Sequence, residues 1–296
     1  MIKAKNWDGE SVMSAEKSPA LAVSSWSLHR ALGLTYPNRP DHDVPLAPEP
    51  TFGPGHLALL DLPAAVAALD IHRIELCSFH LPSRDADYAA AFRAALEKAG
   101  VVLQTLLIEY GDITHPVTRE RDLAWIESWI DTAARFGAEQ ARVIAGRAEP
   151  TRDALDLSVA GLTRLGHYGE ARGVRIVTEN WYELLPGPRE LRYLFDRLDE
   201  TVTLNGDFGN WSGPTKYADL EAIFDLATCC HAKADFSNGV LHAEDYRRCL
   251  AAADAAGFRG PYTLIYDGPD EDEFANLRVE RDFIRRHYEE VRASVG

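Results

Sequence analysis

Three segments of the chain each end a short apolar run with a side chain that metals bind: VRIVTEN (174–180), TVTLNGDFGN (201–210) and CCHAKADF (229–236). The side chains are Glu179, Asp207 and His231. The spacing is 28 residues from 179 to 207 and 24 residues from 207 to 231. Each interval fits one strand, its helix and two loops of a β/α repeat. One open end of a barrel would therefore collect all three side chains.

The same alternation of strand and helix extends outward along the chain. Short β-rich runs predict eight strands, at 21–27, 72–78, 101–108, 141–146, 174–179, 201–207, 229–235 and 262–267. Apolar residues spaced by three and four predict helices at 119–136, 153–172, 186–198, 217–227, 242–256 and 271–293. Glycines just before strands are typical of helix C-caps, and they occur at 100, 137, 173 and 257. Together these signals predict an α/β fold, a (βα)8 TIM barrel.

The domain organisation follows from length and from two segments outside the repeat. A chain of 296 residues suits one barrel domain, since such barrels run to about 250 residues. Residues 1–18 are polar and are expected to form a flexible arm, which leaves 19–296 for the barrel. The Pro-rich stretch 36–56 predicts a long loop over the barrel mouth.

Composition limits the location and the partners. The chain has no apolar signal core and no long apolar run, and its four cysteines lack CxxC spacing. These features predict a cytoplasmic protein without a membrane partner. The formal charge is −15, and no run of Lys and Arg could follow a phosphate backbone, which argues against nucleic acid. The sequence leaves open whether the protein forms a homo-oligomer.

Strand alternation decides which side chains face the barrel interior. It places Asp207 on the face of Asn205, and His231 on the face of Lys233 and Asp235. Charged groups at several strand ends are costly inside a packed barrel unless they are paired or bind a metal. The pattern therefore favours a functional centre at the strand ends.

At five strand segments the chain resembles a known group of proteins: SSWSLHR (24–30), IELCSFHLP (74–82), VTEN (177–180), LNGDFGN (204–210) and HAKAD (231–235). It is similar there to the sugar phosphate isomerase/epimerase superfamily, the xylose isomerase-like TIM barrels that include AP endonuclease family 2. The resemblance spans roughly residues 20–290, and HAKAD is its most specific part. It implies a small-molecule sugar, keto-sugar or polyol derivative as substrate.

The resemblance also implies a divalent metal, most often Mn²⁺, with Mg²⁺, Co²⁺ or Zn²⁺ as alternatives. Its ligands would be Glu179, Asp207, His231 and a last Glu on the eighth strand. The segment GPYTLIYDGP (260–269) places Ile265 at that last position, and Ile cannot bind a metal. Asp267 could fill the site only by reaching back about 6.6 Å along the strand. Alternatively Asp267 begins the DGP turn, and the metal keeps three protein ligands.

The remaining candidates are polar or aromatic residues near predicted strand ends, which the resemblance assigns to a sugar pocket: Trp26, His29, Glu75, His80, Asn180, Trp181, Asn210, Lys233 and Tyr266. Aromatic faces suit the C–H surface of a sugar, but the Trp residues could equally pack in the core. Glu75 and His80 could instead be satisfied polar groups. Lys233 could hold a substrate oxygen or form a salt bridge to Asp235 or Glu179.

The implied chemistry is metal-assisted proton abstraction next to a carbonyl, with Glu179 as base. Family epimerases use two carboxylates on opposite faces of the substrate, and Ile265 removes one of them. One-base isomerisation, or elimination in the manner of the family's inosose dehydratases, is therefore expected, with Lys233, His80 or Tyr266 as acid. A DNA-repair nuclease would need a basic groove, which the formal charge of −15 does not offer. A sugar-binding or accessory barrel without catalysis is the serious alternative.

Overall fold

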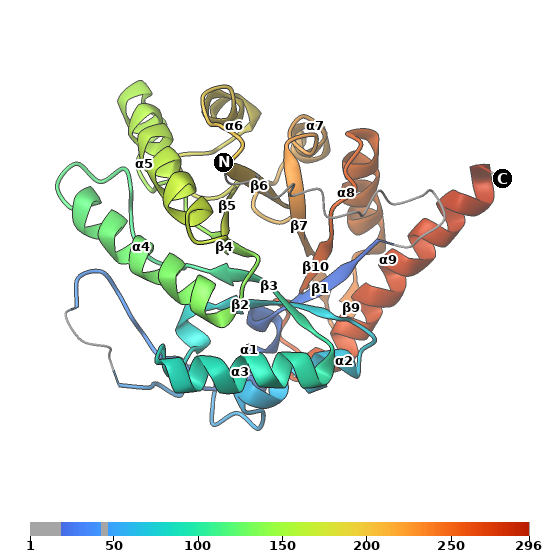
Figure 1. Cartoon of the computed structure of the whole chain (residues 1–296). Coiled ribbons are helices and arrows are strands. Elements are labelled where there is room, and N and C mark those ends of the chain that lie inside the picture. Colours follow the sequence, from blue (N-terminus) through green and yellow to red (C-terminus); the bar gives the residue numbers. More distant parts are fainter. Residues whose placement is uncertain (1–18, 43–46, 296) are drawn as a thin grey trace, which may run out of the picture.

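The computed structural model describes residues 19–42 and 47–295. In these ranges the barrel strands are β1 Leu21–Ser24, β2 Arg73–Cys77, β3 Val102–Leu107, β4 Gln140–Arg142, β5 Arg175–Glu179, β6 Val202–Asp207, β7 Ala227–Lys233 and β10 Tyr262–Ile265. They pair in parallel and close in the order β1-β10-β7-β6-β5-β4-β3-β2. The predicted (βα)8 barrel is confirmed (Figure 1).

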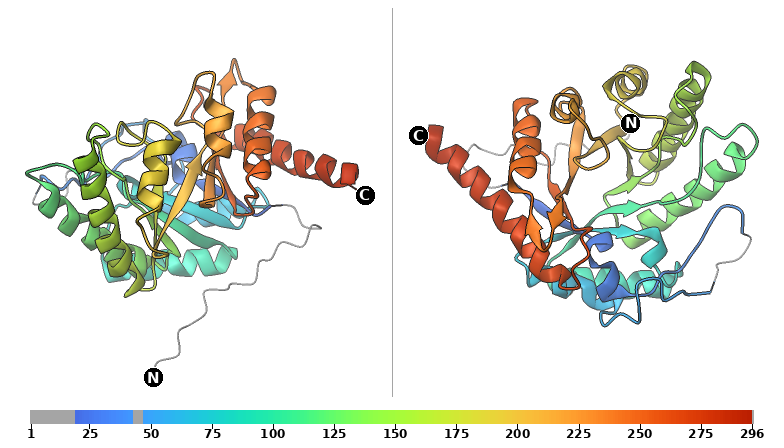
Figure 2. Two further views of the ribbon diagram at one scale, coloured as in Figure 1. Left: turned by 90° about the horizontal axis from the view of Figure 1, so that it is seen from above. Right: turned by 180° about the vertical axis from the view of Figure 1, so that it is seen from behind.

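The helices form the outer layer of the barrel (Figure 2). Their bounds are α1 His29–Leu32, α2 Leu62–Ala67, α3 Ala86–Ala99, α4 Arg119–Phe136, α5 Arg152–Glu170, α6 Pro188–Phe195, α7 Lys216–Glu221, α8 Ala243–Ala255 and α9 Glu273–Val295. Short 3-10 turns lie at η1 Ser25–Leu28, η2 Leu59–Asp61 and η3 Ser78–His80, and a small hairpin at β8 Phe236–Ser237 and β9 Val240–Leu241. No helix within 19–42 and 47–295 combines the length and apolar character needed to cross a bilayer.

The sequence missed α3, although both of its ends carry clear signals. Asp85 accepts a hydrogen bond from the Tyr88 backbone N–H at the start, and Gly100 ends the helix at φ 64°. The buried stripe contains only Ala89, Phe92 and Leu96, so its apolar periodicity is weak in a run dominated by alanine. The first strand also ends earlier than predicted, because the Ser24 side chain caps the η1 turn.

The Pro-rich segment packs on the first βα unit in the residues that the structure describes. Thr35 pairs with Glu49, and Phe52 donates its backbone N–H to the Gly33 carbonyl. The Phe52 ring lies 4.3 Å from the ring of His29. The predicted arm at 1–18 and residues 43–46 of the predicted loop lie outside the described residues.

A buried carboxyl on α9 makes stability depend on pH. Glu280 is 0% exposed, and neither of its side-chain oxygens has a hydrogen-bond partner among the described residues. Burial raises the pKa of Glu280 well above its usual value of 4.5. The folded protein then keeps a proton that the unfolded chain releases, so stability falls as pH rises above that usual value.

We expect Glu280→Gln to melt a few degrees above the wild type at pH 8, since about 1 kcal/mol shifts the Tm of a 150–250-residue domain by about 2–4 °C. Near pH 4 the two proteins should melt at nearly the same temperature, because the carboxyl is then neutral in the folded state and mostly neutral in the unfolded state. Thermal unfolding followed by circular dichroism at both pH values checks this. A difference in Tm that does not change with pH would contradict it.

Candidate functional site

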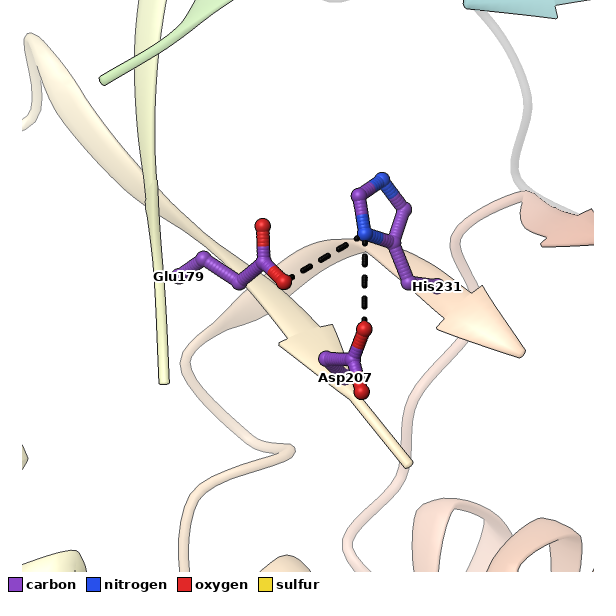
Figure 3. A group of neighbouring side chains, drawn as sticks. All are labelled: Glu179, Asp207 and His231. Atoms are coloured by element: carbon purple, nitrogen blue, oxygen red, sulfur yellow. Dashed lines mark ion pairs between the residues drawn. The ribbon is translucent and has the colours of Figure 1, made fainter. Parts of the chain in front are cut away.

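Three neighbouring strands bring Glu179, Asp207 and His231 together at the carboxyl end of the barrel (Figure 3). The register pairs Asp207 directly with His231. His231 Nδ1 lies 3.4 Å from Glu179 Oε1 and 3.5 Å from Asp207 Oδ2. One ligand atom from each residue lies within 4.8 Å of the others, and all three residues are buried. The predicted convergence of these strand ends is confirmed.

The orientation of the His231 ring suits a cation between the three side chains. Its Nε2 lies 2.8 Å from Glu75 Oε2, a distance at which Nε2–H donates to the carboxylate. Nδ1 then faces the Glu179 and Asp207 carboxylates. Two carboxylates and Nδ1 that converge on one point need a cation between them, either a proton on Nδ1 or a metal bound in its place. The donor set therefore fits a divalent metal.

The electrostatics of the group reflect its mutual contacts. Burial alone would lower the pKa of His231, but Glu179 and Glu75 outweigh burial and raise that pKa well above its usual range. Burial would raise the pKa of Glu179, but His231 and Arg142 lower it to about 2. Burial raises the pKa of Asp207, and the negative charge of Glu179 raises it further. The cluster is thus rich in negative charge and short of cationic partners.

Glu75 does not line a sugar pocket, contrary to the expectation from sequence. It is 1% exposed and lies behind His231, where it also accepts hydrogen bonds from Gln104 Nε2 and Thr105 Oγ1, both at 2.8 Å. Glu75 lies too deep in the barrel to reach the cavity, because it projects into the interior two residues before β2 ends. Its contact with Nε2 fixes which ring nitrogen of His231 faces the carboxylates.

Glu75→Gln should weaken Mn²⁺ binding by about 10–100-fold, the usual cost of removing a carboxylate that orients a ligating His. The amide keeps the size of the side chain but loses the charge that holds Nε2–H. Competition with a fluorescent chelator measures the affinity, and Glu97→Gln on the exposed face of α3 is the control. Equal Mn²⁺ affinity in both variants would contradict the orienting role of Glu75.

A cavity of about 270 Å³ opens beside the three side chains. Glu179, Asp207 and His231 line it, and so do five other residues predicted for the site: Trp26, Trp181, Asn210, Lys233 and Asp267. Asn210 donates its side-chain N–H to Glu179 Oε1 at 2.8 Å and its backbone N–H to Asp207 Oδ1 at 2.9 Å. The cavity is thus a polar space with aromatic walls directly at the predicted metal ligands.

His80 and Tyr266, the expected acids, are not among the residues that line this cavity. His80 lies against Ser25 Oγ at 2.9 Å, and burial lowers its pKa to about 3, which leaves the ring neutral. The Tyr266 hydroxyl accepts a hydrogen bond from the Asp270 backbone N–H at 3.0 Å. Both residues follow the ends of their strands, β2 and β10, where these contacts hold the side chains.

His29 and Asn180 are also absent from the cavity wall. The His29 ring is buried, with Nδ1 2.6 Å from the Trp26 carbonyl oxygen. The Asn180 side chain donates to the Asp207 carbonyl at 3.1 Å and accepts from the Asp207 N–H at 2.7 Å. Asn180 therefore holds the backbone of Asp207 in place, with both ends of its amide engaged.

The fourth corner of the site is apolar. Ile265 ends β10 and lines the cavity. Asp267 lies beyond the strand end, where it accepts a hydrogen bond from Lys233 Nζ at 2.8 Å. Among the described residues Asp267 is not part of the metal-type group, so it does not replace the missing Glu in this arrangement. Lys233 pairs with Asp267, and the alternatives Asp235 and Glu179 are wrong.

The sequence missed two charged residues of the cavity wall, Glu109 and Arg142. Arg142 Nη2 donates to Glu109 Oε1 at 2.6 Å, and Arg142 Nε lies 3.5 Å from Glu179 Oε2. The Arg142 guanidinium also lies 4.9 Å from the ring centre of Trp181. A signal was present, because Arg142 is the one charged residue in the otherwise apolar run ARVIAG (141–146).

The sequence profile of the xylose isomerase-like TIM barrels matches residues 63–287, and the chain belongs to that family. A search of curated proteins found no significant match. The magnesium complex of a xylose isomerase-like TIM barrel protein from Mycobacterium smegmatis is similar in structure, with 18% identity and a TM-score of 0.66. The similarity covers 93% of this chain and 98% of that one.

Two named epimerases have the same fold. L-ribulose 3-epimerase has 14% identity and a TM-score of 0.68, over 94% of this chain and 97% of that chain. D-allulose 3-epimerase from Methylomonas sp. has 13% identity and a TM-score of 0.66, over 92% of this chain and 98% of that chain. At identities this low, the similarity to these structures shows the fold alone.

Proposed function

We propose that this protein is a metal-dependent isomerase that acts on a sugar or keto-sugar by removing a proton next to a carbonyl. The observation that carries the proposal is the buried group of Glu179, Asp207 and His231, whose ligand atoms lie within 4.8 Å at the wall of a cavity. The names of the similar epimerases support a sugar as substrate. The magnesium in another similar structure supports a divalent cation, for which we propose Mn²⁺.

The residues that line the cavity can take different roles in the reaction. A divalent cation held by the three side chains would polarise the carbonyl and hydroxyl oxygens of a sugar. Glu179 is ionised and faces the cavity, and it accepts the proton of the neighbouring carbon. Ile265 leaves no second carboxylate at the opposite corner. The reaction therefore uses one base, which delivers the proton to one face of the substrate.

The position of Lys233 favours elimination as a second candidate. Its ammonium group lines the cavity and is held by Asp267 at 2.8 Å. A Cβ at Gly209 would lie 2.6 Å from Lys233 Cδ, so the glycine leaves room for the Lys233 stem at the cavity wall. From this wall Lys233 can give a proton to a leaving hydroxyl group while Glu179 takes the proton from carbon.

The test is solvent exchange with a panel of ketoses in D₂O, followed by NMR. We expect deuterium to enter next to the carbonyl with the Mn²⁺-loaded protein, to stop after treatment with a chelator, and to resume when Mn²⁺ is returned. Loss of water from the sugar in the same spectra would select elimination. Stoichiometric Mn²⁺ binding without exchange for any ketose or aldose would overturn the enzyme and leave a sugar-binding barrel.

A further inference from the structure

A second hollow adjoins the cavity at the triad and has no place in the chemistry above. It measures about 480 Å³, and Arg39, Phe79, Glu109, Tyr110, Arg147 and Tyr182 are among the residues that line it. Glu109 lines both hollows. The groove, as we call this second hollow, therefore borders the same residue as the cavity at the three metal-type side chains.

Aromatic rings lead from the cavity into the groove. Trp181 lines the cavity and Tyr182 lines the groove, and their ring centres lie 4.1 Å apart at an angle of 30°. The guanidinium of Arg147 lies 4.0 Å from the Tyr182 ring centre and donates to the Glu109 carbonyl oxygen at 3.3 Å. Arg39 lies in the same way over Tyr110, at 5.1 Å. Both faces of the Tyr182 ring are thus covered, by Trp181 and by Arg147, so the groove wall offers ring edges and fixed planar guanidinium groups.

The backbone of Tyr182 is strained. Its φ is +63°, a left-handed conformation that costs a bulky residue roughly 1–3 kcal/mol. Glycine would remove this cost, yet a large aromatic side chain stands here. Tyr182 lines the groove, and its ring packs against the ring of Trp181. An observed strain at this position points to a role for the ring.

The charges of the groove do not suit a phosphate. Three arginines, Arg39, Arg121 and Arg147, line it together with four carboxylates, Asp41, Glu109, Asp112 and Asp122. Arg121 Nε already donates to Asp122 Oδ1 at 2.8 Å. A wall with no excess of positive charge does not favour an anion. It does offer donors and acceptors for hydroxyl groups, next to the apolar edges of aromatic rings.

We propose that the natural substrate is a neutral glycoside: the reacting sugar lies at Glu179, Asp207 and His231, and a second sugar ring lies in the groove against Tyr182 and Tyr110. This proposal rests on the proposed function for the first sugar. The two sites are chemically separate, since the groove contains none of the three metal-type residues. Binding in the groove can therefore be measured apart from metal content and from exchange.

The experiment compares each monosaccharide with its glucosylated forms on the Mn²⁺-loaded protein by titration calorimetry. The probes are fructose against turanose and isomaltulose, and glucose against maltose and cellobiose. We expect at least one disaccharide to bind about tenfold more tightly than its monosaccharide, as one or two added hydrogen bonds to the groove wall provide. No tighter binding for any disaccharide would overturn the proposal. So would a preference for fructose 6-phosphate over every disaccharide, because the groove would then be an anion site.

Tyr182→Gly removes the ring and also relieves the positive φ, so the variant should fold. It should reduce the ratio of disaccharide to monosaccharide affinity from about ten to about one, and Tyr182→Phe should restore the ratio. Tyr193→Ala is the matched control, since Tyr193 on α6 also carries an arginine, Arg197, 3.7 Å from its ring centre. Equal weakening of both ligands by Tyr182→Gly would overturn the role of the groove.

Failure of the proposed function would appear differently. It would be seen as absent Mn²⁺ binding, or as absent deuterium exchange with every probe. A tenfold disaccharide preference that Tyr182→Gly removes would support the groove even then. Tyr110→Ala serves as the second variant if Tyr182→Gly lowers the Tm, and it should reduce the same affinity ratio.

Discussion

Glu179→Gln should lower the rate of deuterium exchange into the substrate by about a thousandfold or more. A general base contributes about 10²–10⁴-fold to the rate of proton transfer, and the amide cannot accept the proton. The substitution also removes a negatively charged ligand from the group whose atoms lie within 4.8 Å. NMR exchange rates at saturating Mn²⁺, with metal content measured on the same samples, separate the loss of base from the loss of metal.

Glu97→Gln, on the exposed face of α3, should retain the wild-type rate and serves as the control. A second carboxylate lies on the cavity wall at Glu109, where it accepts a hydrogen bond from Arg142. Exchange that persists in Glu179→Gln but disappears in Glu109→Gln would identify Glu109 as the base and reject the assignment of Glu179.

Ile265→Glu should change the stereochemistry of the reaction. Ile265 ends β10 and lines the cavity, so a glutamate there would add a carboxylate on a strand other than those of the three metal-type residues. We expect Mn²⁺ to bind at least about tenfold more tightly, which corresponds to about 1.4 kcal/mol for the added ligand. We also expect deuterium to enter from both faces of the carbon, as a second base permits.

Ile265→Gln is the matched control, since it has the size of the glutamate without its charge, and it should keep the single stereochemical outcome. Asp267→Asn should cost far less activity than Glu179→Gln, because Asp267 is paired with Lys233 and lies outside the metal-type group. Deuterium confined to one face in Ile265→Glu, with the metal fully bound, would show that the missing carboxylate does not determine the stereochemistry.

The parts of the fold that depend on backbone periodicity could be predicted from the sequence. Strand and helix repeat at regular intervals, and parallel strands carry their C-terminal residues to one end of a barrel. The spacing of Glu179, Asp207 and His231 was therefore sufficient to predict their meeting. The helix α3 was not predicted, because alanine buries little surface and leaves a weak pattern of hydrophobicity.

The parts of the site that depend on side-chain direction and depth could not be predicted. The chain does not encode in its local pattern that Glu75 lies behind His231, or that Lys233 reaches Asp267 across the top of two strands. The contact between Arg142 and Glu179 joins two strands through long side chains whose rotamers are chosen by packing. His80 and Tyr266 lay near strand ends in sequence, but a turn of one or two residues directs each side chain elsewhere.

The two hydrogen bonds between the Asn180 side chain and the backbone of Asp207 fix the end of β6 against the residue that follows β5. The separation of Glu179 and Asp207 is thus determined by the polypeptide itself. We therefore expect the barrel to fold without an ion, and the proposed metal to bind afterwards at a preorganised site. Exchange of one divalent ion for another would then need no unfolding, and the occupant would follow the supply of metals around the protein.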